Sequence, residues 1–540
     1  MLKKHHIIPI LLIIGNLTII PTRSFGCTSL LVSKKASADS SVFITYSADS
    51  HTLYGSLTHL PATKNTKGTK RKIYHPDTKQ YKGEIEEVEI TYNVVGYMNE
   101  YQVAIGETTF DGRAELQDTT GILDYETLIL LTLQRSQNAR EAISTINSLV
   151  TQYGYCSTGE SFSIADQNEV WIMELIGKGT REKGAVWVAR KIPDGYVSAH
   201  ANQSRIQQFP LNDPENCLYS DDVIKFARKS DYFSGKDEDF SFRDAYNPLT
   251  WEHQRWCEAR VWNFFRQVAP KQIDEEDFAN TNKEIKLPLW IKPDAPITLQ
   301  ALMKHMRNHF EDTQLDLSKG IGSGPFALPY RWRPLTWQVD SVKYCHDRAI
   351  STQQTAYSFV AQSRFWLPNA IGGILWFGFD DTYSTCYSPL FCSITQIPYS
   401  FSNQSGNFNS FSWESAFWVF NFVSNYAYGR YKDMIQDIKL KQSEIETGYI
   451  TENDSITNNA IVLYNQNAKE GVAFLTDYSV NTGNKLTKTW KTLGEFLIWK
   501  YLDGNVRTNE GKVTHPGYEI EWKKAIIKEN EVLYKMKKIE

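Results

Sequence analysis

A cysteine stands at the end of a short apolar leader, in the segment Gly26-Cys27-Thr28-Ser29-Leu30-Leu31-Val32. A thiol attacks a carbonyl carbon only as its thiolate, so it needs a base close by. If a peptidase cuts between Gly26 and Cys27, the thiol and a free α-amino group belong to one residue. An α-amine has an unperturbed pKa of about 7.7–8.0 and can accept the thiol proton near neutral pH. The segment therefore predicts a hydrolase whose amino-terminal residue, Cys27, is both nucleophile and base.

The first 26 residues have the pattern of a signal peptide. Lys3 and Lys4 form a basic start, residues 7–20 are mostly apolar, and a short polar tail ends at Gly26. The apolar run is shorter than the roughly 20 residues that a membrane-spanning helix needs. We therefore expect residues 1–26 to be removed. We expect export to the periplasm, the medium or the cell surface, and no stable membrane span.

Composition excludes some classes of protein. The 540 residues carry a formal net charge of −4 and no basic block, which argues against a nucleic-acid partner. With 41% apolar and 13% aromatic residues, the chain can bury a large core. The cysteines after Cys27 contain no CxxC pair, so no zinc ribbon is predicted, and disulfides and buried free thiols both stay open. These cysteines are Cys156, Cys217, Cys257, Cys345, Cys386 and Cys392.

Histidines and arginines elsewhere in the chain are candidates for binding roles. His305 and His309 are four residues apart and are predicted to form a partly exposed pair on one helix, because the chain has no HExxH motif. It also has no GxSxG elbow and no phosphate loop. We expect no metal and no cofactor, because protein groups can carry every chemical step. Arg331, Arg333 and Arg364 are candidates for binding a substrate carboxylate, since a guanidinium pairs with a carboxylate through a fork of two N–H groups. The alternative for each is packing in the core or at its rim.

The elements around Cys27 follow from hydrophobic patterning. Residues 27–32 and 42–46 read as a β-hairpin, which leads directly to Asp49. The carboxylate of Asp49 could fold back to hold the amine of Cys27, or it could bond its own backbone in a turn. Further strands are predicted at 88–95, 102–106, 161–165, 170–175, 185–189, 196–202, 356–360 and 372–378, and helices within 124–150, 413–440 and 486–502. Residues 61–85 read as a solvated loop and 210–300 as loops and short helices. This order favours a layered α+β fold.

Short segments spread along the chain match a known family. They are Cys27-Thr-Ser-Leu-Leu-Val, Ala104-Ile-Gly-Glu-Thr-Thr-Phe110, Phe162-Ser-Ile-Ala-Asp166, Pro193-Asp-Gly-Tyr-Val-Ser-Ala-His-Ala-Asn202, Tyr330-Arg-Trp-Arg-Pro-Leu335, Phe359-Val-Ala-Gln-Ser-Arg364 and Asp380-Asp-Thr-Tyr-Ser-Thr-Cys386. In these segments the chain resembles the peptidase family C69 dipeptidases, the relatives of dipeptidase A among the N-terminal-nucleophile hydrolases.

The resemblance implies a fold and residue roles. The fold is α+β, a four-layer αββα sandwich of the N-terminal-nucleophile hydrolase type with a largely helical C-terminal extension. Asp49 matches the family's acidic position after the first hairpin. Asn202 matches an asparagine that supplies an oxyanion-hole donor in related hydrolases. An arginine near the nucleophile in the bile-salt-hydrolase branch has no counterpart at Tyr46-Ser47, which argues against that branch's substrates.

We therefore predict a signal peptide over residues 1–26, a catalytic core over 27–400, and a mostly helical region over 401–540 that packs on the core. The predicted protein is a secreted cysteine dipeptidase that hydrolyses dipeptides or other small peptides through a thioester on Cys27. Asn202 and a backbone N–H stabilise the oxyanion, and Asp49 orients the amine.

Two alternatives stay open. One is an N-acyl amide hydrolase of the same fold that acts on substrates such as penicillin V or conjugated bile acids. The other is a non-catalytic surface lipoprotein anchored at Cys27, although Ser24 stands where a lipobox has leucine. The predicted partner is a small peptide substrate, and a homo-oligomer remains open.

Overall fold

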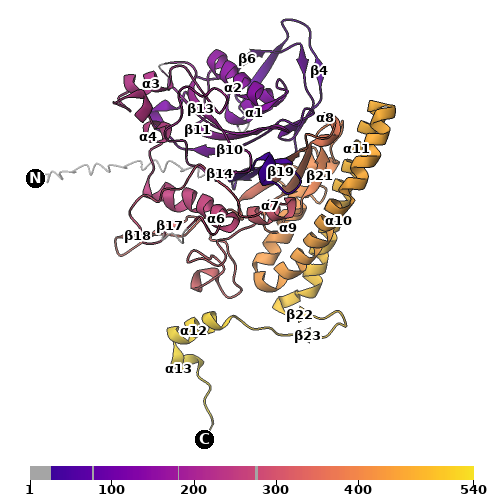
Figure 1. The fold of residues 1–540 in the computed structure, drawn as a ribbon. Helices are drawn as coiled ribbons and strands as arrows, with labels where there is room; N and C mark the ends of the chain where they lie inside the picture. The colour runs from indigo at the N-terminus through magenta and orange to yellow at the C-terminus, as the bar shows by residue number, and fades with distance from the viewer. Residues whose placement is uncertain (1–25, 76–77, 181, 274–277, 540) are drawn as a thin grey trace, which may run out of the picture.

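A computed structural model describes residues 26–75, 78–180, 182–273 and 278–539 (Figure 1). The predicted signal peptide therefore lies outside the described residues, apart from Gly26. Most of the strands belong to two large antiparallel sheets.

The first sheet contains, among its interior strands, the strand that begins two residues after Cys27. Its order is β16-β14-β1-β2-β19-β20-β21. These strands are β1 (Ser29–Val32), β2 (Val42–Asp49), β14 (Val197–His200), β16 (Trp290–Ile291), β19 (Thr355–Ser363), β20 (Ile374–Phe379) and β21 (Ser388–Phe391). In the predicted hairpin Leu31 lies opposite Ile44, and Thr28 pairs with Ser47 in an isolated bridge. Both strands are buried along their length, as their apolar and β-branched residues favour. The prediction of this hairpin is confirmed.

The second sheet has the order β15-β13-β12-β11-β10-β9-β8-β3. Its strands are β3 (His59–Leu60), β8 (Val94–Val95), β9 (Met98–Asn99), β10 (Ala104–Phe110), β11 (Gly159–Ala165), β12 (Val170–Gly177), β13 (Ala185–Lys191) and β15 (Cys217–Tyr219). Its four long neighbours, β10 to β13, are successive antiparallel strands in which each pairs with the next. They agree with four of the predicted strands.

The two sheets pack face to face, with β2 and β1 of the first against β10 of the second. His200 of β14 crosses this interface: Nδ1 lies 2.7 Å from Thr108 Oγ1 and Nε2 lies 2.7 Å from Ser163 Oγ. Burial lowers the pKa of His200 to about 3, so the ring is neutral and serves as a hydrogen-bonded bridge between the sheets.

Helices contact the outer face of each sheet (Figure 1). On the second sheet lie α1 (Tyr125–Leu133), α2 (Ala139–Tyr153) and α3 (Val223–Lys229). On the first lie α6 (Ala259–Val268), α9 (Ala416–Tyr428), α10 (Tyr431–Gln466) and α11 (Ala468–Lys500). The prediction of a mixed α and β fold with antiparallel sheets is confirmed.

The remaining elements are short. They are α4 (Phe242–Tyr246), α5 (Trp251–His253), the π-helical turn η4 (Gln254–Glu258), α7 (Leu299–Met306), α8 (Asn369–Gly372), α12 (Ile520–Glu529) and α13 (Glu531–Tyr534). Two-stranded pairs are β4 (Thr63–Lys64) with β7 (Ile90–Thr91), β5 (Lys70–Tyr74) with β6 (Tyr81–Glu86), β17 (Thr336–Val339) with β18 (Val342–Cys345), and β22 (Val506–Arg507) with β23 (Val513–Thr514).

Three local predictions are wrong in detail. Residues 61–85 are not a plain loop, since β5 and β6 form a hairpin there. The helix predicted over 413–440 is broken after Tyr428, and α10 starts at Tyr431 and runs on to Gln466. His305 and His309 do not share a helix, because α7 ends at Met306.

All seven cysteines lie in the described residues, and each is free. In the same ranges, we find no helix with both the length and the apolar character that crossing a bilayer requires.

Candidate active site

Cys27 lies two residues before β1, an interior strand of the first sheet, and only 3% of its surface is exposed. Its Sγ is 3.6 Å from Glu107 Oε1 and 3.9 Å from Tyr46 Oη. Burial, with further contributions from Glu107 and Asp49, raises the pKa of the Cys27 thiol well above its usual value. The sulfur is therefore protonated at neutral pH in this environment and needs a proton acceptor to become a nucleophile.

Asn202 holds the backbone nitrogen of Cys27. The N–H of Cys27 donates to Asn202 Oδ1 at 2.8 Å, and Asn202 Nδ2 donates to the Thr109 carbonyl at 2.6 Å. Asn202 follows β14, which pairs directly with β1. Its φ of 60° lies in the left-handed region, which asparagine tolerates better than most residues. A strained backbone at this point fits a functional position, and one amide hydrogen of Asn202 stays available for a further acceptor.

Asp49 ends β2, the neighbour of β1. Its carboxyl accepts hydrogen bonds from Thr355 Oγ1 at 2.7 Å and from Arg348 Nη2 at 3.2 Å, and its backbone carbonyl accepts from Gly26 N at 3.1 Å. Burial raises the pKa of Asp49 to about 6 even though Arg348 and Thr355 favour the ionised form. Asp49 thus holds Gly26 through its backbone carbonyl, and its carboxyl lies close enough to Cys27 to raise the pKa of the thiol.

Arg260, which the sequence analysis missed, joins these parts. It is fully buried, and Nη1 donates to the Cys27 carbonyl at 2.7 Å while Nη2 donates to Asn202 Oδ1 at 3.0 Å. Arg260 stands at the start of α6, directly after the π-helical turn η4. Such turns are frequent at functional sites because they shift the side chains that follow. The segment Ala259–Val268 also contains Arg266, so the sequence pattern alone did not single out Arg260.

Glu107 of β10 is the second residue that was missed. Tyr46 Oη donates to Glu107 Oε1 at 2.5 Å, so the two sheets meet at the Cys27 sulfur. Glu160 of β11 lies close by, and Thr109 Oγ1 donates to its Oε1 at 2.9 Å. Burial raises the pKa of both glutamates, and for Glu160 the proximity of Glu107 adds to it. A glutamate inside the apolar strand pattern of residues 103–110 was the signal that could have found this pair.

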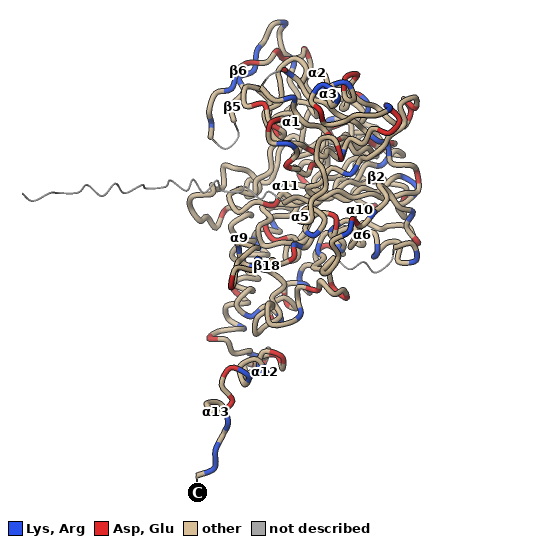
Figure 2. Tube along the Cα trace, turned by 90° about the vertical axis from the view of Figure 1, so that its left-hand side faces the viewer, with Lys and Arg blue, Asp and Glu red and all other residues tan. Residues whose placement is uncertain are grey.

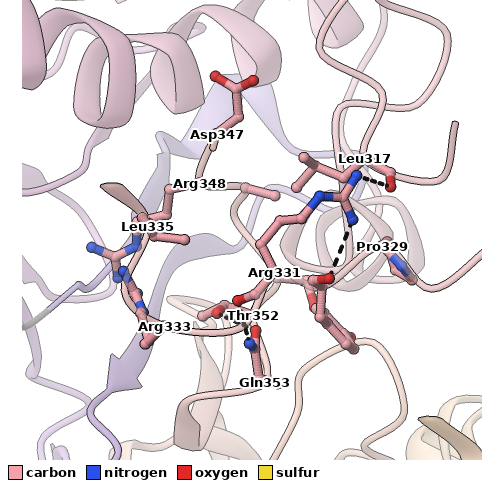
Figure 3. A pocket seen from close by; sticks show the side chains of 12 residues that line it. Leu317, Pro329, Arg331, Arg333, Leu335, Asp347, Arg348, Thr352 and Gln353 are labelled. Carbon is pink, nitrogen blue, oxygen red and sulfur yellow. Dashed lines mark hydrogen bonds between the residues drawn. The ribbon is translucent and has the colours of Figure 1, made fainter. Parts of the chain in front are cut away.

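The three predicted arginines lie in different places. Arg331 donates to the backbone carbonyls of Leu328, Tyr330 and Leu317 (Figure 3). Arg364 lies beyond the far end of β19 from Asp49, where it donates to the carbonyls of Gly372 and Ile371.

Arg333 is the one that approaches Asp49. It donates to Gln354 Oε1, and burial together with the nearby Arg348 lowers its pKa to about 10. In Figure 3 the side chains of Arg333 and Arg348 extend to the same side of the view, whereas Arg331 turns toward Leu317.

Residues for a metal do not gather anywhere in the described ranges, where no three His, Cys, Asp or Glu side chains form a group that could hold an ion. His305 Nδ1 lies 3.1 Å from Gln267 Oε1. The chemistry available at Cys27 is nucleophilic and acid–base.

Comparisons with known proteins agree on one family. The sequence profile of peptidase family C69 matches residues 26–444. A probable dipeptidase of Latilactobacillus sakei is 25% identical over 481 residues, which cover 84% of this chain and 90% of the relative. A probable dipeptidase of Salmonella dublin is 24% identical over 398 residues, covering 68% and 81%. Probable dipeptidase A of Streptococcus pyogenes serotype M1 is 25% identical over 404 residues, covering 71% and 78%. The matched region begins directly before Cys27 and contains every site residue described above.

Proposed function

The chain belongs to peptidase family C69, and on this basis we propose that it is an exported cysteine dipeptidase that hydrolyses dipeptides or other small peptides through Cys27. The observation that carries the proposal is the set of contacts at Cys27. Asn202 binds its nitrogen, Arg260 binds its carbonyl, and the thiol lies beside Glu107. Fixing both backbone groups of Cys27 holds its side chain in one orientation, as a nucleophile requires.

The proposed cycle begins with removal of residues 1–26, which turns the Cys27 nitrogen into an α-amine. This amine accepts the thiol proton, and Sγ attacks the peptide carbonyl. The second amide hydrogen of Asn202 and a backbone N–H stabilise the oxyanion. The protonated amine then donates to the leaving amine of the substrate, and water hydrolyses the thioester.

Asp49 has an electrostatic role in this proposal. Its carboxylate lies close enough to Cys27 to affect the pKa of the thiol, and it would stabilise the ammonium that forms during the reaction. Arg260 keeps Cys27 and Asn202 in place through the contacts given above. Neither residue exchanges a proton in the cycle.

The assignment of the fold and the parts of the chain belongs to the same proposal. Two face-to-face sheets with helices on their outer faces support an αββα sandwich of the N-terminal-nucleophile hydrolase type. We assign residues 1–26 to a signal peptide, 27–400 to the catalytic core, and 401–540 to a mostly helical region packed on the core.

The decisive experiment is the intact mass and amino-terminal sequence of the protein purified from its native host, followed by hydrolysis assays. We expect a free Cys27 terminus and release of both amino acids from dipeptides. Preference for an N-acyl amide over a peptide with a free amino group would favour the acylase alternative. A diacylglyceryl group on Cys27 would contradict the mechanism, because it blocks the sulfur and the amine.

Replacement of the nucleophile gives a second check. Cys27→Ser conserves the size of the side chain and should preserve the fold, measured by circular dichroism and thermal unfolding. Loss of the thiolate should lower kcat by at least about 10³-fold. Unchanged turnover of dipeptides by this variant would exclude Cys27 as the nucleophile.

A further inference from the structure

Positive charge is concentrated beside Cys27. Arg260, Arg333 and Arg348 interact electrostatically with one another and with one carboxylate, Asp49. Burial is the main cause that lowers the pKa of Arg260 and Arg333, each to about 10, so both stay protonated at neutral pH. Asp49, with a pKa of about 6, offsets only one of the three charges. A buried group of like charges is costly unless an anion joins it.

Arg348 is the least satisfied member of this group. Only 6% of its surface is exposed, and its one ion pair within the described residues is with Asp49. Its Nε is buried and has no hydrogen-bond acceptor among those residues. A buried guanidinium N–H without an acceptor costs stability, which points to a site where an acceptor is meant to arrive.

A pocket connects Arg348 to Arg333. Both arginines line this pocket (Figure 3). The lining also includes Asp347, but this carboxylate is already paired with Arg255, with Oδ2 lying 3.0 Å from Nη2. It therefore leaves the excess positive charge of the pocket unchanged.

The pocket lies next to the place where the chain would be cut. The backbone of Gly26 packs directly on Arg348: a Cβ at this position would stand 1.0 Å from Nη2. Removal of residues 1–26 would take away that contact and uncover the guanidinium beside the new amino terminus. The site would then become accessible when Cys27 gains its α-amine.

We propose that Arg348 and Arg333 bind a carboxylate group of the peptide substrate and so position the scissile bond at Cys27. The proposal rests on the proposed peptidase function and adds to it the group that the enzyme recognises. Two guanidinium groups around one pocket can offer a carboxylate several charge-assisted hydrogen bonds in a fixed geometry. A dipeptide carries such a group at its C-terminus, within one residue of the bond to be cut.

The carboxylate could also be an acidic side chain, and three ligands separate the two sources. They are Ala-Ala, Ala-Ala amide and Glu-Ala amide. Binding is measured by calorimetry on Cys27→Ala protein, purified with its terminus at residue 27, and kcat/KM is measured on the wild type. We expect Ala-Ala to bind about 10- to 100-fold more tightly than Ala-Ala amide and to have a kcat/KM that is higher by a similar factor, because charge-assisted hydrogen bonds to its carboxylate are lost in the amide. Arg333→Gln should remove most of this preference by raising KM, and Arg333→Lys should restore part of it.

Lys343→Gln is the matched control. Lys343 is an exposed cation on β18, so its loss changes the net charge equally without touching the pocket. We expect it to keep the preference for the free carboxylate. Arg333-dependent binding of Glu-Ala amide in place of Ala-Ala would also support the site and identify the side chain as the source.

Equal binding of Ala-Ala and Ala-Ala amide, with neither Glu-Ala amide nor Arg333 making a difference, would overturn the inference. The two proposals fail separately in these experiments. Carboxylate-dependent binding without any turnover would contradict the peptidase function and leave the site standing. Turnover at the same rate with and without a substrate carboxylate would contradict the carboxylate site and leave the peptidase function standing.

Discussion

At the scale of residues, two buried carboxyl groups, those of Glu107 and Glu160, lie close together beside the nucleophile. Thr109 Oγ1 lies 3.4 Å from Glu107 Oε2 and 2.9 Å from Glu160 Oε1. Because ionising both would place two negative charges in a buried site, we infer that the pair holds at least one proton near neutral pH. A neutral Glu107 also leaves the neighbouring Cys27 sulfur freer to ionise, since a carboxylate there would oppose the thiolate.

Glu160→Gln should therefore alter the pH dependence of stability. A carboxyl whose folded pKa lies above its unfolded value of about 4.3 contributes its full stability below that pH and loses it as pH rises toward the folded pKa. Glutamine does not titrate and has no such loss. The free energy of unfolding of the variant should therefore rise relative to that of the wild type as pH increases above about 4.3, by at most about 1.4 kcal/mol per pH unit. Urea unfolding at several pH values between 4 and 8 measures the difference. A constant difference across this range would show that Glu160 titrates normally in the folded protein.

Asn202 permits a test that separates backbone strain from chemistry. Asn202→Ala and Asn202→Gly both remove the amide that binds Cys27 N, but only alanine is strained at a φ of 60°. Alanine should thus cost about 1 kcal/mol more in the free energy of unfolding than glycine. Both variants should lose about 10²- to 10³-fold in activity, with kcat falling more than KM rises. Full activity in the glycine variant would exclude a role for the amide.

Some site residues could be predicted from the sequence and others could not. Asp49 and Asn202 follow strands that a local pattern indicates, and the structure places both next to Cys27. Arg260 and Arg348 are far from Cys27 in sequence, and they reach the site only through the packing of α6 and of a long loop. The periodicity of apolar residues within one helix or strand does not predict contacts between residues that are so far apart in the sequence.

At the scale of elements, the sequence predicted the buried strands and helices better than the exposed ones. The β1–β2 hairpin and the α1–α2 pair present apolar residues at the spacing of their secondary structure, because one face or both are buried. The β5–β6 hairpin was missed because it is mostly exposed: Ile73 and Ile85 are its buried residues, and its other positions are largely charged or polar. Hydrophobic patterning in a sequence indicates which residues contact the core. A peripheral hairpin has few such contacts, so its sequence shows little of this pattern.

The close approach of the two sheets depends on a glycine. A Cβ at Gly106 of β10 would lie 3.2 Å from Tyr46 Cβ and 3.3 Å from the Thr45 carbonyl, both on β2. Gly106→Ala should therefore force the sheets apart where Glu107 and Tyr46 meet the Cys27 sulfur. We expect a loss of about 1–3 kcal/mol in the free energy of unfolding, together with reduced kcat.

Gly448 is a control for the same glycine-to-alanine substitution at a position with open space around it. It lies exposed on α10, and no described atom would come within 4 Å of a Cβ there. Gly448→Ala should stabilise the protein by about 0.5–1 kcal/mol through helix propensity alone and leave kcat unchanged. Equal effects of the two substitutions in thermal and urea unfolding would contradict the packing argument.

At the scale of the whole molecule, the helical C-terminal region has two parts. The helices α9 and α11 contact β20 and β21, and Trp490 of α11 stacks on Phe420 of α9 at 4.8 Å. After α11 the chain stays in contact with the body through the backbone of Glu519 and through α12, which contacts residues 321–323, and α13 then leads away from the body (Figures 1 and 2). Neither α12 nor α13 has a buried residue. Cooperative stability should therefore end near residue 519.

Two truncations test where the cooperative unit ends. A chain ending at Glu519 loses no buried side chain, because those of α12 and α13 are exposed or half-buried, so its free energy of unfolding should stay within about 0.5 kcal/mol of the full chain. A chain ending at Leu502 also loses the carbonyls of Gly504 and Pro516, which accept from the buried Arg430 at 2.6 and 2.8 Å. Leaving these guanidinium N–H groups without acceptors should cost about 1–3 kcal/mol. If the shorter truncation, at Glu519, already lowered stability by that amount, α12 and α13 would have to contribute to the folded unit despite their exposure, for example by covering a second copy of the chain. Sedimentation of the full-length and truncated proteins would then show a change in mass.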